Sequence, residues 1–344
     1  MSLPDTAAAR KPRRLGLIIP FAIALVLVAA LSAGWFWLRG QAVREMDARI
    51  EAMRSAGWEV AWKERKVAGF PFRLNLTFTE ARVRDPSGWA LSTPRLEAQS
   101  PIYALGDWIA AAPDGLAFTR PIGGPVEVRG RLIRASYEAA DGPSSVSFEG
   151  RDLTFAPAPG AQAFALTAAE VVELHLRPMP EDDQGVVRFR VDQGKAGPAG
   201  LFGRIAGDKP VGMIFEAVFD KAANFSGRDW GSAVRAWTDA GGRLSVRQVG
   251  ITAGEAQVGA QNGTLTVGTD GRLRGELDAS LQRAPQALEA LGAAGIIPQE
   301  TAKVAAAVIQ ARAADGEAAR ATLAFQAGRA TLGPVALGPA PRVY

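Results

Sequence analysis

The most constraining feature of the chain is an uncharged stretch near its start, residues 15–38. As an α-helix this stretch would be ~36 Å long, enough to cross a hydrocarbon core of about 30 Å with some tilt. Basic residues precede it and aromatic residues end it: Arg10, Lys11, Arg13 and Arg14 before it, and Trp35, Phe36 and Trp37 at its end. Because basic residues stay on the cytoplasmic side and Trp rings settle at the membrane–water interface, we predict a single-pass anchor, with residues 1–14 a cytoplasmic tail.

Two other interpretations of residues 15–38 explain less. A cleaved signal peptide would use Val28-Ala29-Ala30 as its cleavage site, but its apolar region normally has about 7–15 residues, and cleavage would leave Trp35 near a new N-terminus. A buried core helix does not account for basic residues on one side and aromatic residues on the other. We therefore favour the uncleaved anchor.

The composition excludes one class of function and one kind of stabilisation. The chain has 39 Lys+Arg and 35 Asp+Glu, and without residues 1–14 these become 35 and 34, so the large domain is nearly neutral. Nucleic-acid binding needs a basic patch, and we exclude that class. The chain has no cysteine, so no disulfide framework exists, and the ~300 residues beyond the anchor are enough to bury a core without one.

Residues 39–56 are predicted to continue the anchor as a helical stalk. Val43, Met46, Ile50 and Met53 recur at spacings of three, four and three, which places them on one face of a helix. Charged residues lie elsewhere around the helix: Arg44, Glu45, Asp47, Arg49 and Glu51.

From residue 57 the apolar period changes to two, which is typical of strands with one buried and one solvated face. The clearest examples are Trp58, Val60 and Trp62, then Phe72, Leu74, Leu76 and Phe78, and later Val211, Met213, Phe215, Ala217 and Phe219. Further alternating segments lie at residues 126–132, 146–148, 153–155, 172–176, 187–191, 244–246, 264–267, 272–281, 322–326 and 329–337.

Only a few helices interrupt these strands. Trp230, Val234 and Trp237 are spaced four and three apart and are followed by Gly241-Gly242, which predicts a short helix. Residues 283–314 predict two more, the second beginning near Pro298. We therefore predict a mainly β protein over residues 57–344, a large, antiparallel, curved sheet with a few packing helices. A weak sub-boundary is expected near residues 193–210, which are rich in Gly and Pro.

The sequence resembles a family of alphaproteobacterial proteins of unknown function, DUF2125. The residues that carry the resemblance are Gly69-Phe70-Pro71-Phe72-Arg73-Leu74, Trp89 with residues 91–98, and Leu332-Gly333-Pro334-Val335-Ala336-Leu337-Gly338. Repeated hairpins that begin at a Gly turn, as at Asn262-Gly263, are more distantly similar to AsmA-type proteins of the inner membrane. That second resemblance implies curved periplasmic sheets with roles in lipid transport, so we expect an inner-membrane anchor and a periplasmic domain.

No catalytic constellation is found in the sequence. His175 is the only histidine, and its place between Leu174 and Leu176 in an alternating segment puts it on the solvated face. A Ser–His–Asp triad or a histidine metal site is therefore not expected. The acidic run Glu181-Asp182-Asp183 favours a solvated loop over a calcium site. We expect no cofactor and no enzyme activity.

The aromatic and apolar residues of the predicted strands suggest either an ordinary core or an apolar groove. In the groove hypothesis the lining residues are Trp58, Trp62, Phe72, Leu74, Leu76, Phe78, Trp89, Phe215, Trp230 and Trp237. The residues expected to hold the anchor at the two membrane surfaces are Arg13, Arg14, Trp35 and Trp37. Exposed apolar surface of this kind marks contact with a partner or a lipid. We expect a protein that binds phospholipid or an envelope protein on its sheet. The alternatives are a structural module without a ligand and a membrane-tethered carboxylate hydrolase.

Overall fold

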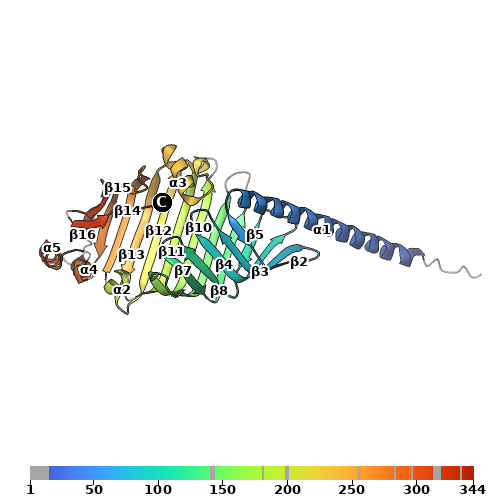
Figure 1. The fold of residues 1–344 in the computed structure, drawn as a ribbon, viewed down its shortest axis with the longest axis horizontal. Coiled ribbons are helices and arrows are strands. Elements are labelled where there is room, and N and C mark those ends of the chain that lie inside the picture. The colour runs from blue at the N-terminus through green and yellow to red at the C-terminus, as the bar shows by residue number, and fades with distance from the viewer. Residues whose placement is uncertain are drawn as a thin grey trace, which may run out of the picture.

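The computed structural model describes residues 15–139, 144–179, 182–197, 201–254, 256–282, 284–293, 295, 297–312, 319–333 and 335–344. The predicted cytoplasmic tail, with Arg13 and Arg14, lies outside the described residues. The described chain forms one long helix followed by a mainly β domain, as predicted (Figure 1).

The segments predicted as anchor and stalk form a single helix, α1 (Leu15–Ser55). Its apolar part, up to Trp37, exposes most side chains, and the helix is long and apolar enough to cross a membrane. In its later half Val43, Met46, Ile50 and Met53 are half-buried. Polar contacts join this half to the first strands: Arg65 pairs with Asp47 at 2.5 Å, and the Arg54 guanidinium donates to the Val60 carbonyl at 2.8 Å.

The described residues contain eighteen strands in one antiparallel sheet. The strands are β1 (Glu59–Ala61), β2 (Glu64–Ala68), β3 (Arg73–Arg84), β4 (Ala90–Pro101), β5 (Trp108–Ala111), β6 (Leu116–Arg120), β7 (Gly124–Arg129), β8 (Leu132–Glu138), β9 (Ser145–Pro157), β10 (Leu166–Met179), β11 (Gln184–Ala196), β12 (Val211–Asp220), β13 (Leu244–Ala253), β14 (Ala256–Val267), β15 (Leu273–Gln282), β16 (Ala319–Gln326), β17 (Arg329–Leu332) and β18 (Val335–Pro339).

Strand order follows chain order from β9 to β18, with each strand paired to the next. At the other end, β1 and β2 both pair with β3, which pairs with β4. Between β4 and β9 the strands pair along two separate routes. One route runs from β4 through β5 and β8 to β9, and the other from β4 through β6 and β7 to β9. The sheet runs through the weak boundary predicted near residues 193–210, because β11 and β12 pair there.

The sheet is strongly curved. Eight strand-to-strand steps separate β1 from β12, which would be ~38 Å on a flat sheet. Yet Trp58, next to β1, donates its indole N–H to the carbonyl of Arg228 in the loop after β12, at 3.0 Å. The sheet therefore curves, so that its β1 edge lies close to the loop after β12.

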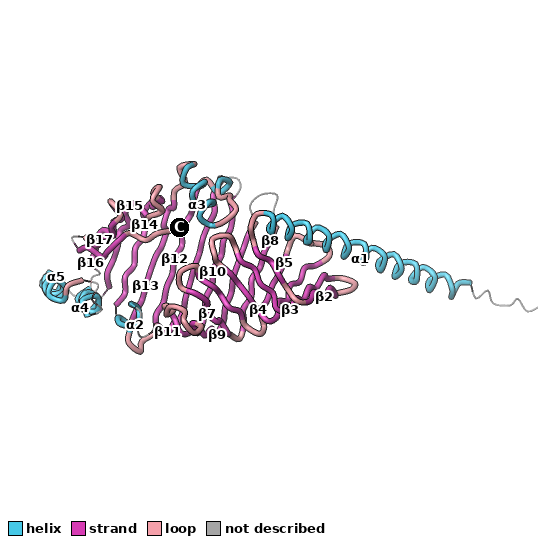
Figure 2. Tube along the Cα trace, in the orientation of Figure 1, coloured by secondary structure: helices cyan, strands magenta, loops and turns pink. Residues whose placement is uncertain are grey.

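The described helices beyond α1 are short and lie at the margins of the sheet (Figure 2). They are α2 (Leu201–Ala206), the 3-10 turn Ala222–Asn224, α3 (Trp230–Asp239), α4 (Ala284–Ala293) and α5 (Gln299–Arg312). Helix α3 begins where predicted, because Asp229 caps it: its carboxylate accepts from the Ser232 N–H at 2.7 Å, and Ser232 Oγ accepts from the Asp229 N–H.

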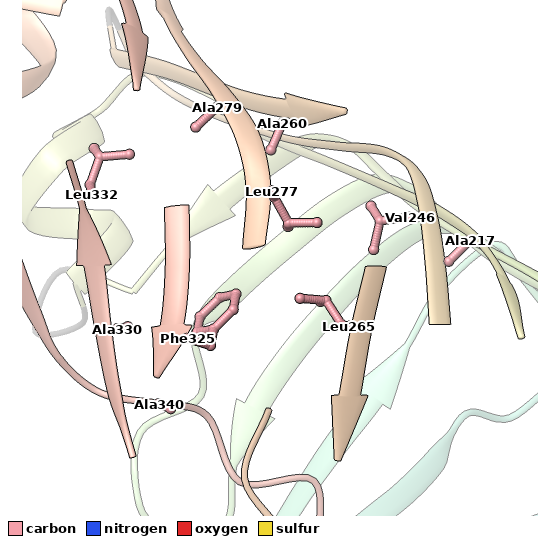
Figure 3. Close-up of a cluster of buried hydrophobic side chains, with 10 residues drawn as sticks. All are labelled: Ala217, Val246, Ala260, Leu265, Leu277, Ala279, Phe325, Ala330, Leu332 and Ala340. Atoms are coloured by element: carbon pink, nitrogen blue, oxygen red, sulfur yellow. The ribbon is translucent and has the colours of Figure 1, made fainter. Parts of the chain in front are cut away.

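The largest buried cluster lies at the C-terminal end of the sheet (Figure 3). Leu265, Leu277, Phe325 and Leu332 from β14 to β17 pack together there, with small alanines between them. Smaller buried clusters lie along the middle of the sheet, one around Leu153 and another around Val191.

Candidate functional site

One face of the sheet carries an unbroken line of apolar side chains, which we call the apolar row. Each member lies directly opposite the next on a neighbouring strand. The row has one residue from each of thirteen strands: Val67, Leu76, Ala98, Ala110, Ala135, Phe148, Leu174, Phe189, Phe215, Val249, Ala260, Ala279 and Ala321. At about 4.8 Å per strand, the row extends ~58 Å along the sheet.

Burial varies along the row, and its two end members, Val67 and Ala321, are half-buried. Leu76 near one end and Ala260 and Ala279 near the other are buried. The residues between them, from Ala98 to Val249, are only half-buried. Their neighbours on the opposite face include Glu149, Arg190 and Glu216, so the two faces differ sharply in polarity.

Between the row and α3 lies an apolar cavity of about 400 Å³, which we call the inner cavity. Phe215 and Phe219 of β12, Leu176 of β10 and Trp237 of α3 line it. Trp237 is held in place by its indole N–H, which donates to the Asp220 carbonyl at 2.6 Å. With its polar atom satisfied inside the protein, the ring presents only carbon to the cavity.

A larger and more open cavity of about 1000 Å³, the aromatic cavity, lies between the first strands of the sheet on one side and α3 with the C-terminal tail on the other. Trp58, Trp89 and Phe118 line the first side, and Trp230 of α3 and Tyr344 of the tail line the second. Trp89 stacks on Phe118 with ring centroids 5.2 Å apart. The pairing of β4 with β6 brings these two rings together.

The two cavities share a wall. Trp230 and Val343 line both, and the Trp230 indole N–H donates to the Val343 carbonyl at 2.7 Å. Trp230 is nearly half exposed. This ring and the C-terminal tail therefore separate the two cavities.

Charge gathers at the aromatic cavity rather than at the inner one. Arg120, Arg235 and Arg342 line the aromatic cavity together with Asp85 and Asp229. The Arg235 guanidinium lies 5.1 Å from the Tyr344 ring centroid. Hydrogen bonds from the backbone and side chain of Ser232 hold the pKa of Asp229 below its ordinary value, so that carboxylate serves the helix cap. The excess of arginine suits an anionic group beside an apolar one.

The structure places the predicted groove residues in three groups and leaves Phe72 apart from them. Trp58, Trp89 and Trp230 line the aromatic cavity, and Phe215, Trp230 and Trp237 line the inner cavity. Trp62, Leu74, Leu76 and Phe78 lie at the α1 end of the sheet, where Arg54 and Arg65 lie over Trp62 and Trp62 packs edge-on against Phe78. Phe72 joins neither cavity, because it lies in the turn before β3 and is 66% exposed.

The two tryptophans of the predicted anchor belt occupy different environments. Trp35 is only 5% exposed, and its indole N–H donates to the Arg73 carbonyl at 3.1 Å. It therefore joins the helix to the sheet. Trp37, two residues later on the helix, is 62% exposed.

Phe118, Val343 and Tyr344 are cavity residues that sequence reasoning missed. The sequence around Phe118 gave no clear alternation, and the two C-terminal residues reach the cavity only because the tail crosses back along β15, where the Leu273 N–H donates to the Pro341 carbonyl. A segment that packs against a distant part of the chain in this way has no recognisable pattern in its own local sequence.

The histidine and the acidic run singled out in the sequence do not line either cavity where the structure describes them. His175 lies on the face opposite the row, with Nδ1 3.0 Å from Ser147 Oγ. Asp183 accepts from the Ala223 N–H at 2.8 Å, while Glu181 lies outside the described residues. In the described part of the chain no group of three or more His, Cys, Asp or Glu side chains could hold a metal ion.

Comparison with known proteins identifies a family that covers nearly the whole domain. A family model described as "Uncharacterized protein conserved in bacteria (DUF2125)" matches residues 35–341. No curated protein and no solved structure matches the chain. The match begins at Trp35, the residue that joins α1 to the sheet, and it confirms the first resemblance. The resemblance to AsmA-type proteins stays a prediction.

Proposed function

The chain belongs to the DUF2125 family, and we propose that it is a lipid-binding protein of the bacterial cell envelope. In this proposal α1 anchors it in the inner membrane, and the periplasmic sheet holds acyl chains on the apolar row. The observation that carries the proposal is the row itself, which runs over thirteen strands without a polar member.

The cavities support the same ligand class. Pockets that bind small molecules usually have volumes of about 300–1,000 Å³, and both cavities lie in this range. The inner cavity is apolar and suits an acyl chain. The aromatic cavity adds Arg235 and Arg342, which suit the phosphate of a headgroup.

The orientation of the sheet supports an anchored carrier. Helix α1 leaves from the β2–β3 end, and α4, α5 and β16 lie at the far end (Figure 1). The row therefore leads away from the anchor. Its start lies beside the stalk, where Arg54 and Asp47 contact the first strands.

A matched pair of substitutions on β12 tests the proposal. Phe215→Glu puts a carboxylate into the row and the inner cavity, whereas Ile214→Glu puts the same group on the opposite face one residue away. The full chain is purified in detergent, and phospholipid per protein is measured by mass spectrometry after exhaustive detergent exchange. Phe215→Glu should lose phospholipid that Ile214→Glu and the native chain retain, because burying a charge against acyl chains is costly. Equal phospholipid in all three proteins would instead favour an interaction module without a lipid ligand.

A further inference from the structure

A second apolar surface lies at the α1 end of the domain, away from both cavities. It consists of Phe36 and Trp37 on α1 and of Phe70 and Phe72 in the turn before β3, and we call it the aromatic edge. Phe70 is 51% exposed and Phe72 66%. Water-exposed phenylalanines next to one another are costly unless something covers them.

The aromatic edge is continuous with the membrane helix. The Phe70 ring lies edge-on to Trp35 with centroids 5.5 Å apart, and it stacks on Phe36 at 6.5 Å. The Arg73 carbonyl at the end of the turn accepts the Trp35 indole N–H. The turn is thereby fixed at the level of Trp35, which is only ~3 Å along the helix axis from Trp37.

Two arginines, Arg39 and Arg73, lie next to these rings in the chain. Arg39 follows Trp37 after one residue, and its guanidinium carbon lies 6.0 Å from the Trp35 ring centroid. Arg73 is exposed, and its guanidinium donates a long hydrogen bond of 3.4 Å to Gln99 Oε1. Aromatic rings with arginines next to them match a bilayer interface, where phosphates lie outside the acyl chains.

We infer that residues 69–73 sit in the interface of the same bilayer that holds α1. Phe70 and Phe72 occupy the boundary between headgroups and acyl chains, and Arg39 and Arg73 bind lipid phosphates. The domain then rests on the membrane at two places, the helix and this turn. The second contact fixes the tilt of the sheet and holds the start of the apolar row against the membrane surface. This inference rests on α1 spanning the membrane and is independent of what the row binds.

The absence of cysteine from the native chain allows a direct test. Single spin labels are placed in the full chain at Phe72→Cys, at Ile122→Cys and at Leu27→Cys. The chain is reconstituted in vesicles of phosphatidylethanolamine and phosphatidylglycerol, and the accessibility of each label to oxygen and to a water-soluble nickel complex is measured. Ile122 is the matched control, since it is an apolar residue 88% exposed at the opposite ends of the strands, ~35 Å from the turn. Leu27 reports the middle of the apolar helix.

We expect the label at 72 to favour oxygen over the nickel complex, as the label at 27 does, and the label at 122 to favour the nickel complex. The label at 72 could instead be as accessible to the nickel complex as the label at 122, while the label at 27 is shielded. That result would overturn the inference and still support α1 as a membrane-spanning helix. If the label at 27 is also accessible, α1 does not span the bilayer and the premise fails. Since Phe72 is two-thirds exposed, its replacement leaves the packing of the domain intact.

Discussion

Trp58 and Arg228 are 170 residues apart in the chain, yet the indole N–H of one donates to the carbonyl of the other at 3.0 Å. This bond closes the curved sheet across the aromatic cavity. It ties the start of β1, next to the end of α1, to the loop that leads into α3. Trp58 is also part of the lining of this cavity, so the bond fixes one of its walls.

Trp58→Phe should therefore loosen the closure of the sheet. The ring is largely retained, but the Arg228 carbonyl loses its donor, and the free energy of unfolding should fall by about 1 kcal/mol. Thermal denaturation of the full chain in detergent measures the loss. Trp89→Phe is the control, because its stacking on Phe118 needs only an aromatic ring. A Trp89→Phe loss as large as that of Trp58→Phe would contradict the role of the bond.

The cap of α3 should make stability depend on pH. The Ser232 hydrogen bonds lower the pKa of Asp229 from its ordinary value of 3.8, so the folded state favours the carboxylate. The contribution is present above the ordinary pKa and is lost as the pH falls through the lowered one. Asp229→Ala should destabilise the protein by about 1 kcal/mol at neutral pH and little in strong acid.

Asp229→Asn separates the cap from the charge. Asparagine caps helices about as well as aspartate, so most of the stability at neutral pH should remain while this part of the acid dependence disappears. Denaturation midpoints of the three proteins at neutral pH and at pH values below 3.8 provide the comparison. An unchanged acid dependence in Asp229→Asn would show that the carboxylate charge is not involved.

Two glycines on β14 should respond differently to the same substitution. A Cβ at Gly263 would lie 2.3 Å from the Glu276 carbonyl oxygen on β15, and backbone cannot move aside cheaply. At Gly259 the nearest atom would be Ser280 Oγ at 3.4 Å. Gly263→Ala should cost about 1–3 kcal/mol, and Gly259→Ala should change stability by less than about 0.5 kcal/mol. Similar denaturation midpoints for the two variants would show that Gly263, at the irregularity between Gln261 and Thr264, is not closely packed against β15.

Local patterns predicted much of the fold. The four-and-three spacing of Trp230, Val234 and Trp237 predicted α3, and alternation predicted β3 and β12, because each signal depends only on near neighbours in the chain. Strand β2 was missed because three consecutive charged residues, Glu64 to Lys66, hide its alternation. Strands β5 and β6 are short and have no clear polar face.

The candidate site could be predicted only in part. Strand alternation indicated that Phe215 lies on an apolar face, but the row depends on which residues of thirteen strands lie opposite one another. That register is set by hairpins and bulges, as at Glu216 and Ala217. Phe72 follows the same alternation as Leu74, yet it lies outside the strand, because the turn that contacts α1 ends only at Arg73.

The central claim is that lipid lies on the row, and photo-crosslinking from neighbouring residues of β10 tests it most directly. Leu176 points into the inner cavity and His175 to the opposite face. The full chain with p-benzoylphenylalanine at one position or the other is irradiated in membranes, and the purified protein is weighed by mass spectrometry. We predict an adduct with the mass of a phospholipid from position 176 and none from position 175. No lipid adduct from position 176, or equal adducts from both positions, would contradict the account.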